Sequence, residues 1–535
     1  MNFLKILRTI PRYIIKNNLI LVIIKFAKFF LDIIGISLFF VIIFNLINNQ
    51  TTKLDLTFYK LDFSFLNNLL ISEVIFITAF VFFIKFFITL ILNFLELFIY
   101  NKNLIFTQKI GLKNFYFKDY LEQKNKDVSK TYRNLTSEIK FTTVYILNLV
   151  NFLTNLLILI AAIILIFLIS GINAVFVVII IFTSLIFFYI LFKDKLNKYG
   201  ETRILYNRKF YQFFHETIKF LKETKIFNKS KSIINRLSHL KQKEWQVGYL
   251  SKFINASTPS IIEFLLIMFI LLILFLNINI DLFKNAEFIV FIIILSRLLP
   301  YLKELQLNIN QMSLNYPSYE VFSRNFHELK NKDEKKNIHQ KLNNLDIETQ
   351  VNEKNYSLNF SINKKFLIIS EQKNLDKLSD RFIGIEADNT KIFFNGEELS
   401  DIKLSNKIGE IGFCNNSPII FNANLFDNIT LFSKKIDTSK LEKIKNLLGL
   451  SYIFEKYTDE LLIDKNVEYE IRIKLGLARA LYLGKDYFIF NNVINQNNFD
   501  KTTIDRIFDY LNEKFVIVLS NNEENFDNFS DFIKI

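Results

Sequence analysis

The hydrophobic and polar positions divide the chain into two halves of different character. A helix needs about 20 predominantly apolar residues to cross the hydrocarbon core of a bilayer. The first half contains apolar runs of that length at 19–47, 71–98, 143–169, 173–192, 260–279 and 286–303. We therefore expect residues 1–303 to form a membrane domain of six spanning helices.

The segments between these runs differ in charge and length. Basic stretches at 99–141 and 193–258 are long and have helical periodicity, whereas the loop at 48–70 carries only Lys53 and Lys60 as cations. Cytoplasmic loops carry an excess of Lys and Arg. We therefore expect both termini and both long loops to be cytoplasmic, with the spans continuing as helices beyond the lipid.

The second half changes to strand and helix patterns. Residues 304–343 are typical of a helical extension followed by a charged linker. Beyond them, the short apolar segments KKFLIIS, TKIFFNG, YFIFN and FVIVLS alternate with helical patterns. Such alternation predicts an α/β domain at 344–535 with a substantially parallel sheet.

Composition narrows the class of protein. Hydrophobic residues make up 51% of the 535 residues and Phe occurs 61 times, so part of the chain is expected to lie in lipid. The net charge of +14 is concentrated in the membrane half, where the cations flank apolar runs. This pattern favours membrane topology over nucleic-acid binding. A single Cys excludes a disulfide framework. The spacing of the four His matches no known arrangement of metal ligands.

Local sequence strings resemble those of ABC exporter half-transporters. The segment 389–429 is similar to the family's stretch that ends in the Q-loop, with Pro418 and Phe421 before Asn428 and Ile429. LGLARAL at 475–481 resembles the helix after the family's signature motif, and YFIF follows where the Walker B strand is expected. The resemblance implies an all-α six-helix bundle of the type I ABC exporter kind, followed by an α/β domain similar to P-loop NTPases.

Within that family, the membrane half is most similar to flippases of lipid-linked oligosaccharides in protein glycosylation. The segments that carry this similarity are 119–141, 208–230 and 296–306. It implies a protein of the inner (plasma) membrane that moves a lipid-linked oligosaccharide or a related amphiphile as a homodimer, or as a heterodimer with another ABC half-transporter. Two alternatives remain: a non-transporting structural or regulatory subunit of an ABC or glycan-assembly complex, and an exporter of peptides or toxins.

The phosphate-binding loop that this family needs is not apparent. Such a loop uses glycines to wrap a phosphate, a Lys for charge and a Ser or Thr for magnesium. In SEQKNLDKL, Ser370 and Leu375 stand at the glycine positions, Asp376 at the lysine and Lys377 at the Ser/Thr. A shift of one residue places Lys377 at the lysine but supplies no glycine.

The other positions that the resemblance assigns to ATP chemistry also lack the residues that the family uses. An amide cannot act as a general base or supply negative charge toward magnesium. Asn416 replaces the Q-loop glutamine, Glu468, Tyr469 and Glu470 occupy the signature, Asn491 and Asn492 replace the Walker B carboxylates, and Asn521 replaces the switch histidine. ATP and magnesium are therefore implied by the family only, and we expect a degenerate domain with little or no ATP hydrolysis and no bound cofactor.

Charged residues inside apolar runs are candidates for a substrate cavity, because charge in lipid is costly. Lys85, Arg297 and Asp32 are such residues, and Arg297 resembles the position from which the flippases present a cation to a lipid pyrophosphate. The alternative is structural: Asp32 pairs with a cation, and charges close to span ends extend to the interface.

Overall fold

The chain folds into two compact units that divide between residues 333 and 334. The computed structural model describes residues 12–47, 71–116, 127–170, 173–276, 286–330, 344–351, 354–361, 365–383, 390–394, 396–398, 411–456, 467–521, 529 and 531–534.

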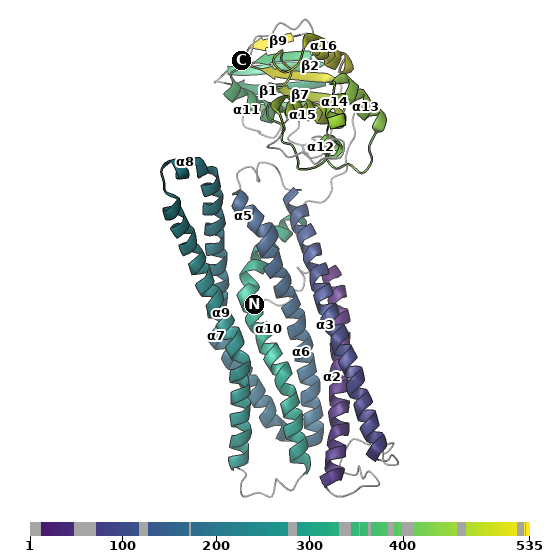
Figure 1. Ribbon diagram of the computed structural model, residues 1–535, viewed down its shortest axis with the longest axis vertical. Helices are drawn as coiled ribbons and strands as arrows, with labels where there is room; N and C mark the ends of the chain where they lie inside the picture. Colours follow the sequence, from purple (N-terminus) through teal and green to yellow (C-terminus); the bar gives the residue numbers. More distant parts are fainter. Residues whose placement is uncertain are drawn as a thin grey trace. The chain divides into compact units, whose positions relative to one another are not determined.

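The first unit is a bundle of long helices (Figure 1). Its helices are α2 (Arg12–Ile47), α3 (Ile71–Tyr116), α5 (Val128–Arg133), a π-helical turn (Asn134–Glu138), α6 (Ile139–Ser170), α7 (Asn173–Lys219), α8 (Leu221–Ile226), α9 (Ser230–Leu276) and α10 (Ala286–Lys330). Every predicted apolar run except 260–279 lies wholly within one of these helices, and α9 covers that run up to Leu276. The loop at 48–70 lies outside the described residues.

The predicted helical extensions are confirmed. The α3 helix continues to Tyr116, and α7 and α9 run from the apolar runs to a short turn around α8. By length and composition, two helical stretches among the described residues are apolar enough to cross a membrane, Ser72–Tyr116 and Val128–Ile164.

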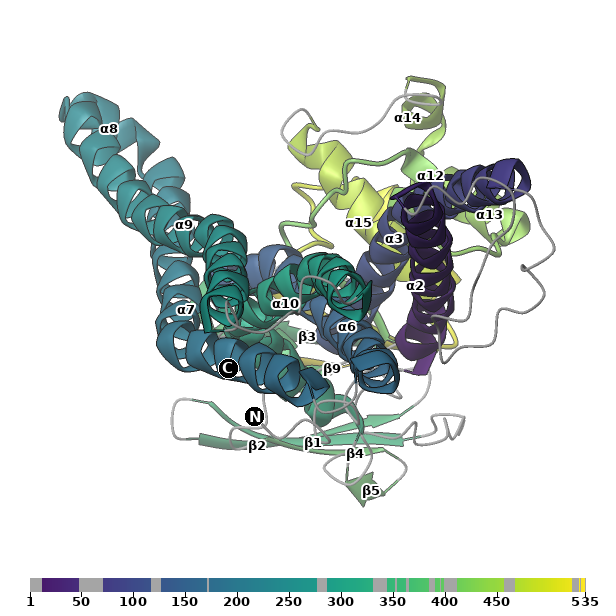
Figure 2. The ribbon, with the colours of Figure 1, turned by 90° about the horizontal axis from the view of Figure 1, so that it is seen from below.

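Helix α10 is the centre of the bundle. In the view of Figure 2 it lies between α6 and the α7–α9 pair, and it contacts all three helices. Gly200 permits the approach of α7, because an added Cβ would lie 2.3 Å from the carbonyl oxygen of Leu314. On the α6 side, the rings of Tyr145 and Tyr319 stack with their centroids 4.7 Å apart.

A buried ion pair marks the π-helical turn. Arg133 and Glu138 are 3% and 2% exposed, and Arg133 Nε lies 3.8 Å from Glu138 Oε1. The Arg133 guanidinium also donates to the carbonyl of Ile204 on α7. The extra residue of a π-turn changes the rotation of the helix by one position, and here it occurs where the two charged side chains meet.

The second unit contains two sheets. Strands β1 (Asn344–Val351), β2 (Lys354–Ser361), β4 (Thr390–Phe394) and β5 (Glu397–Glu398) form an antiparallel sheet in the order β2-β1-β4-β5. Strands β3 (Lys365–Ile369), β6 (Ile411–Cys414), β7 (Tyr487–Asn491), β8 (Phe515–Ser520) and β9 (Asp531–Lys534) form a parallel sheet in the order β6-β7-β8-β3-β9. The predicted parallel sheet is confirmed.

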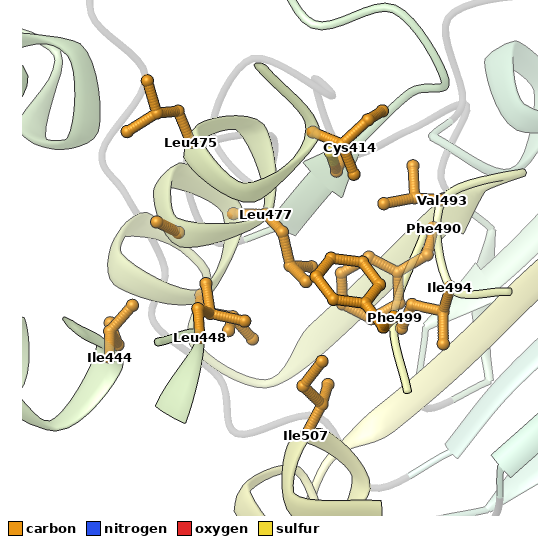
Figure 3. Close-up of a cluster of buried hydrophobic side chains, with 14 of the residues drawn as sticks. Cys414, Ile444, Leu448, Leu475, Leu477, Phe490, Val493, Ile494, Phe499 and Ile507 are labelled. Atoms are coloured by element: carbon orange, nitrogen blue, oxygen red, sulfur yellow. The ribbon is translucent and has the colours of Figure 1, made fainter. Parts of the chain in front are cut away.

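In the described residues, the helices between these strands are α11 (Gln372–Phe382), α12 (Leu425–Thr430), α13 (Thr438–Leu447), α14 (Ser451–Lys456), α15 (Tyr469–Leu483) and α16 (Lys501–Tyr510). The larger core lies on the side of α15, where Leu477 packs among Phe490, Phe499 and their neighbours (Figure 3). A second core forms around α11 on Leu375, Leu378 and Phe382. The parallel sheet is therefore buried on both faces.

Candidate functional site

Four of the predicted site residues lie at the carboxyl edge of the parallel sheet. The strands β3, β8, β7 and β6 are parallel, so their carboxyl ends meet at one edge, where α/β sheets bind ligands. Ser370 follows β3, Asn521 follows β8, Asn491 ends β7 and Asn416 lies two residues beyond β6. The strand order thus brings residues from four separate motif positions to one edge.

The junction between β3 and α11 is short. Strand β3 ends at Ile369 and α11 begins at Gln372, so Ser370 and Glu371 alone connect them. The N–H of Ser370 continues the sheet by donating to the carbonyl of Ser520 at 3.1 Å. The carbonyl of Glu371 already accepts the first helical hydrogen bonds, from Asn374 at 2.8 Å and from Leu375 at 3.2 Å.

Helix α11 thus occupies the sequence in which the phosphate loop is expected. Leu375, expected at a glycine position, is completely buried in the core together with Leu378 and Phe382. Asp376 and Lys377 lie more than one turn inside the helix and are exposed. The spacing of the buried positions 375, 378 and 382 is the signal from which this helix could have been predicted.

Asp376 and Asn491 meet across the edge. Asn491 Nδ2 donates to Asp376 Oδ1 at 2.7 Å, and the Asn491 side chain is 1% exposed. Asn491 Oδ1 has no hydrogen-bond partner among the described residues. The next residue, Asn492, has a φ of 54°, and its N–H donates to the carbonyl of Leu519 at 2.7 Å. The chain therefore turns sharply directly after β7, because Asn adopts the left-handed backbone conformation more readily than most residues.

Glu371 is a residue that the sequence interpretation missed. It is the N-cap of α11 and is exposed. A helix N-terminus carries partial positive charge and favours an anion. In this chain a carboxylate of the protein itself stands at that position.

The residues expected at the signature lie at the start of α15. Glu468 is the N-cap of this helix, and Glu468, Tyr469 and Glu470 are all exposed. Glu470 forms an ion pair with Lys474 at 2.6 Å, and the Tyr469 hydroxyl donates to the carbonyl of Asn416 at 3.3 Å. The structure therefore brings the signature and Q-loop positions of the same chain together.

The segment between β6 and α12 is held by Arg479 and Asn428. Arg479 Nε donates to the carbonyl of Asn428 at 2.8 Å, and its Nη2 donates to the carbonyl of Ile419 at 3.0 Å. The Asn428 amide bonds both the N–H and the carbonyl of Phe421, at 2.8 and 3.0 Å. Burial lowers the pKa of Arg479. The Arg479 and Asn428 side chains therefore hold this loop through hydrogen bonds to its backbone.

In the bundle, two of the three candidate cavity residues are brought together. Lys85 on α3 and Asp32 on α2 form an ion pair, and the Tyr301 hydroxyl on α10 donates to Asp32 Oδ2 at 2.9 Å. Tyr301 was missed by the sequence interpretation, because only the tertiary structure brings residue 301 close to residue 32. Arg297 belongs to α10, but its side chain lies outside the described part of the structure.

Metal ligands are not gathered in the described part of the chain. Among those residues, no group of three or more His, Cys, Asp or Glu side chains could hold a metal ion. The expectation of no metal site stays a prediction.

Comparison with known proteins identifies the fold. No protein-family model matches the sequence, and no curated protein matches it. A solved structure described as a bacterial Atm1-family ABC exporter with ATP bound is similar, with a TM-score of 0.73 over 96% of this chain and 91% of that chain at 9% sequence identity. The predicted fold class is confirmed: the chain has the fold of an ABC exporter half-transporter, a helical bundle followed by a sheet-containing α/β domain.

Proposed function

We propose that the chain is an integral membrane protein of the ABC exporter type whose C-terminal domain keeps the fold of an ATPase without its chemistry. The observation that carries this proposal is the two-residue connection between β3 and α11. A phosphate loop wraps several successive backbone N–H groups around a phosphate. Two residues followed at once by a helix leave no such loop.

The charges at the edge support the same conclusion. A triphosphate at this position would face the carboxylates of Glu371 and Asp376, and like charges at short range repel by roughly several kcal/mol at low effective dielectric. Asn491 and Asn492 supply amides where a magnesium ion prefers carboxylates. The residues present therefore do not fit ATP with magnesium, and Glu468 and Glu470 would likewise repel a nucleotide held by a partner chain.

The membrane part of the proposal rests on the apolar runs and on the exporter fold. We propose six spans in the inner (plasma) membrane with both termini in the cytoplasm, and assembly as a homodimer or with another ABC half-transporter. The proposed substrate is a lipid-linked oligosaccharide or a related amphiphile. Its basis is the resemblance of the segments 119–141, 208–230 and 296–306 to lipid-linked oligosaccharide flippases.

Nucleotide binding is the first test. The full-length protein in detergent is titrated with ATP and Mg²⁺, and its thermal unfolding and phosphate release are measured. We expect no shift of the unfolding temperature and no phosphate release above that of a mock preparation. Hydrolysis that is abolished by Lys377→Ala and retained by Lys443→Ala, an exposed lysine on α13, would refute the proposal.

The non-transporting alternative has one observation in its favour. Asp32 neutralises Lys85, a cation expected to face an anionic lipid. A scrambling assay separates the two functions. The protein is reconstituted into vesicles with a fluorescent polyprenyl-pyrophosphate oligosaccharide, and the accessibility of this lipid to an external quencher is followed. Faster equilibration than in protein-free vesicles supports a flippase, and equal rates support a structural or regulatory subunit.

A further inference from the structure

Ionisable side chains join four helices in the interior of the bundle. The first group consists of Asp32 on α2, Lys85 on α3 and Tyr301 on α10, with side-chain exposures of 14% for Asp32 and 22% for Lys85. Both oxygens of the Asp32 carboxylate are engaged, one by the ammonium and the other by the hydroxyl. This group therefore holds three helices together by charge and hydrogen bonding.

A second group lies two helical turns away on α2. Lys25 Nζ is 3.6 Å from Glu96 Oε1 on α3 and donates to Asn151 Oδ1 on α6 at 3.0 Å. The Asn151 amide closes the triangle by donating to Glu96 Oε1 at 2.9 Å. Seven residues separate Lys25 from Asp32, which corresponds to about 10 Å along a helix.

Glu304 on α10 links the two groups. It accepts a hydrogen bond from Asn155 at 3.1 Å, and Asn155 lies one turn from Asn151 on α6. Glu304 is also three residues from Tyr301, a spacing that places side chains on the same helix face. The Asn155–Glu304 hydrogen bond thus lies one helical turn from each group, on α6 toward the second and on α10 toward the first.

The charged and polar groups of this network come from four helices. Helix α3 presents Lys85, and α10 presents Tyr301 and Glu304. Helix α6 contributes the amides of Asn151 and Asn155, and Lys28 lies one turn before Asp32 on α2 itself. Lys85 pairs with Asp32 and Lys25 pairs with Glu96, so each of these two ion pairs is neutral.

Neutrality in this network depends on the packing of the helices. Asp32 lies near the middle of the apolar run 19–47, where an unpaired charge is costly. Separation of α3 from α2 would leave the Asp32 carboxylate without its cation, and breaking a buried ion pair in this way is strongly unfavourable. Proton uptake removes the charge and therefore the penalty.

We propose that the bundle is a proton-coupled device: Asp32 binds a proton when Lys85 moves away and releases it when the ion pair re-forms. One proton adds to one carboxylate oxygen in the first step and leaves in the second, and no electrons are transferred. A proton gradient then drives the movement of α2, α3 and α10, which supplies energy that the C-terminal domain does not draw from ATP. The inference rests on the proposed membrane function of the bundle, but it does not require that ATP hydrolysis be absent.

Proton flux through the reconstituted full-length protein tests this inference directly. Vesicles loaded with pyranine are given a pH gradient, with valinomycin and potassium to set the potential, and no nucleotide is added. We expect the gradient to collapse faster than in protein-free vesicles. Asp32→Asn should reduce the rate to that of protein-free vesicles, whereas Glu263→Gln should keep the wild-type rate, because Glu263 pairs with Lys303 outside the network.

A double variant covers the case in which Asp32→Asn fails to fold. Replacing a buried ion pair by apolar residues is often neutral for stability, so Asp32→Leu with Lys85→Met should fold and still lose the flux. Flotation with the vesicles reports insertion separately. Protein that does not insert refutes the membrane function, whereas inserted protein with no flux, or with equal flux in Asp32→Asn, refutes proton coupling alone.

Discussion

At the residue scale, Gly476 is required by a contact with a proline. An added Cβ would lie 2.4 Å from Pro418 Cγ and 3.0 Å from Cys414 Sγ. Gly476→Ala should therefore destabilise the C-terminal domain by about 1–3 kcal/mol, the usual cost of overpacking. Thermal unfolding of the full-length protein measures this loss. Gly248→Ala on α9 is the matched control, because an added Cβ there meets nothing within 4 Å, and alanine should stabilise that helix by up to about 1 kcal/mol.

Cys414 supplies a prediction about pH. Burial raises the pKa of its thiol to about 12, and the Arg479 guanidinium offsets only part of this shift. A free thiol in the unfolded chain has a pKa near ~8.5. Between these values the unfolded chain has lost a proton that the folded chain keeps, so stability falls as the pH rises through this interval.

The reaction rate of the Cys414 thiol tests whether its pKa is raised. At pH 8 the folded protein should react with a disulfide reagent such as DTNB far more slowly than the protein in guanidinium chloride, because only the thiolate is nucleophilic. Equal rates in the two conditions would show that Cys414 is neither buried nor held as the thiol.

At the element scale, the π-helical turn depends on the Arg133–Glu138 pair. Arg133→Met leaves Glu138 buried without its cation and should cost about 3–5 kcal/mol. The double variant Arg133→Met with Glu138→Leu should recover part of that loss, since both charges of the pair are then removed, whereas the buried Arg203 loses its interaction with Glu138. A double-mutant cycle on thermal unfolding measures the coupling. Arg324→Ala is the control, because its i,i+4 pair with Glu320 is exposed and should contribute nothing measurable.

Elements were predictable from the sequence wherever one pattern dominated. The apolar runs located the six long helices among the described residues, and helical periodicity predicted that these helices continue beyond the apolar runs. The strands YFIFN and FVIVLS lie as predicted, because short apolar runs between turn residues are typical of a buried parallel sheet. The π-turn at Asn134–Glu138 has no such signal, since the contact of Arg133 with Glu138 and with the carbonyl of Ile204 exists only in the folded bundle.

The resemblance assigned motif positions along the sequence, but it did not predict the shape of the candidate site. The structure places Asn491 and Asn416 at one sheet edge, because parallel strands align their carboxyl ends. The phosphate-loop pattern nevertheless implied a loop at 370–377, where α11 begins at Gln372. Likewise, the pairing of Asp32 with Lys85 and Tyr301 depends on the packing of three helices, which spacing along the chain does not encode.

At the scale of the whole molecule, the two units have separate hydrophobic cores and opposite charge. Residues 344–535 hold 24 Lys and Arg against 30 Asp and Glu, so the excess of cations belongs to the first 343 residues. The clusters around Leu477 and Leu375 contain residues of the second unit alone, and those around Phe29 and Tyr145 contain residues of the bundle. Two cores that share no member are expected to unfold in separate steps, in which case no single free energy of unfolding describes the chain.

The chain contains one natural probe for each unit. Its single Trp, Trp245, stacks on Tyr249 in α9, and its single Cys, Cys414, is buried in the C-terminal domain. Heating in detergent should therefore give a transition in Trp emission that differs in temperature from the exposure of the thiol to DTNB. Gly476→Ala should lower only the thiol transition, and Arg133→Met should lower only the fluorescence transition. If both probes shift together in both variants, the two cores unfold as one cooperative unit, and the separation inferred from their residues is wrong.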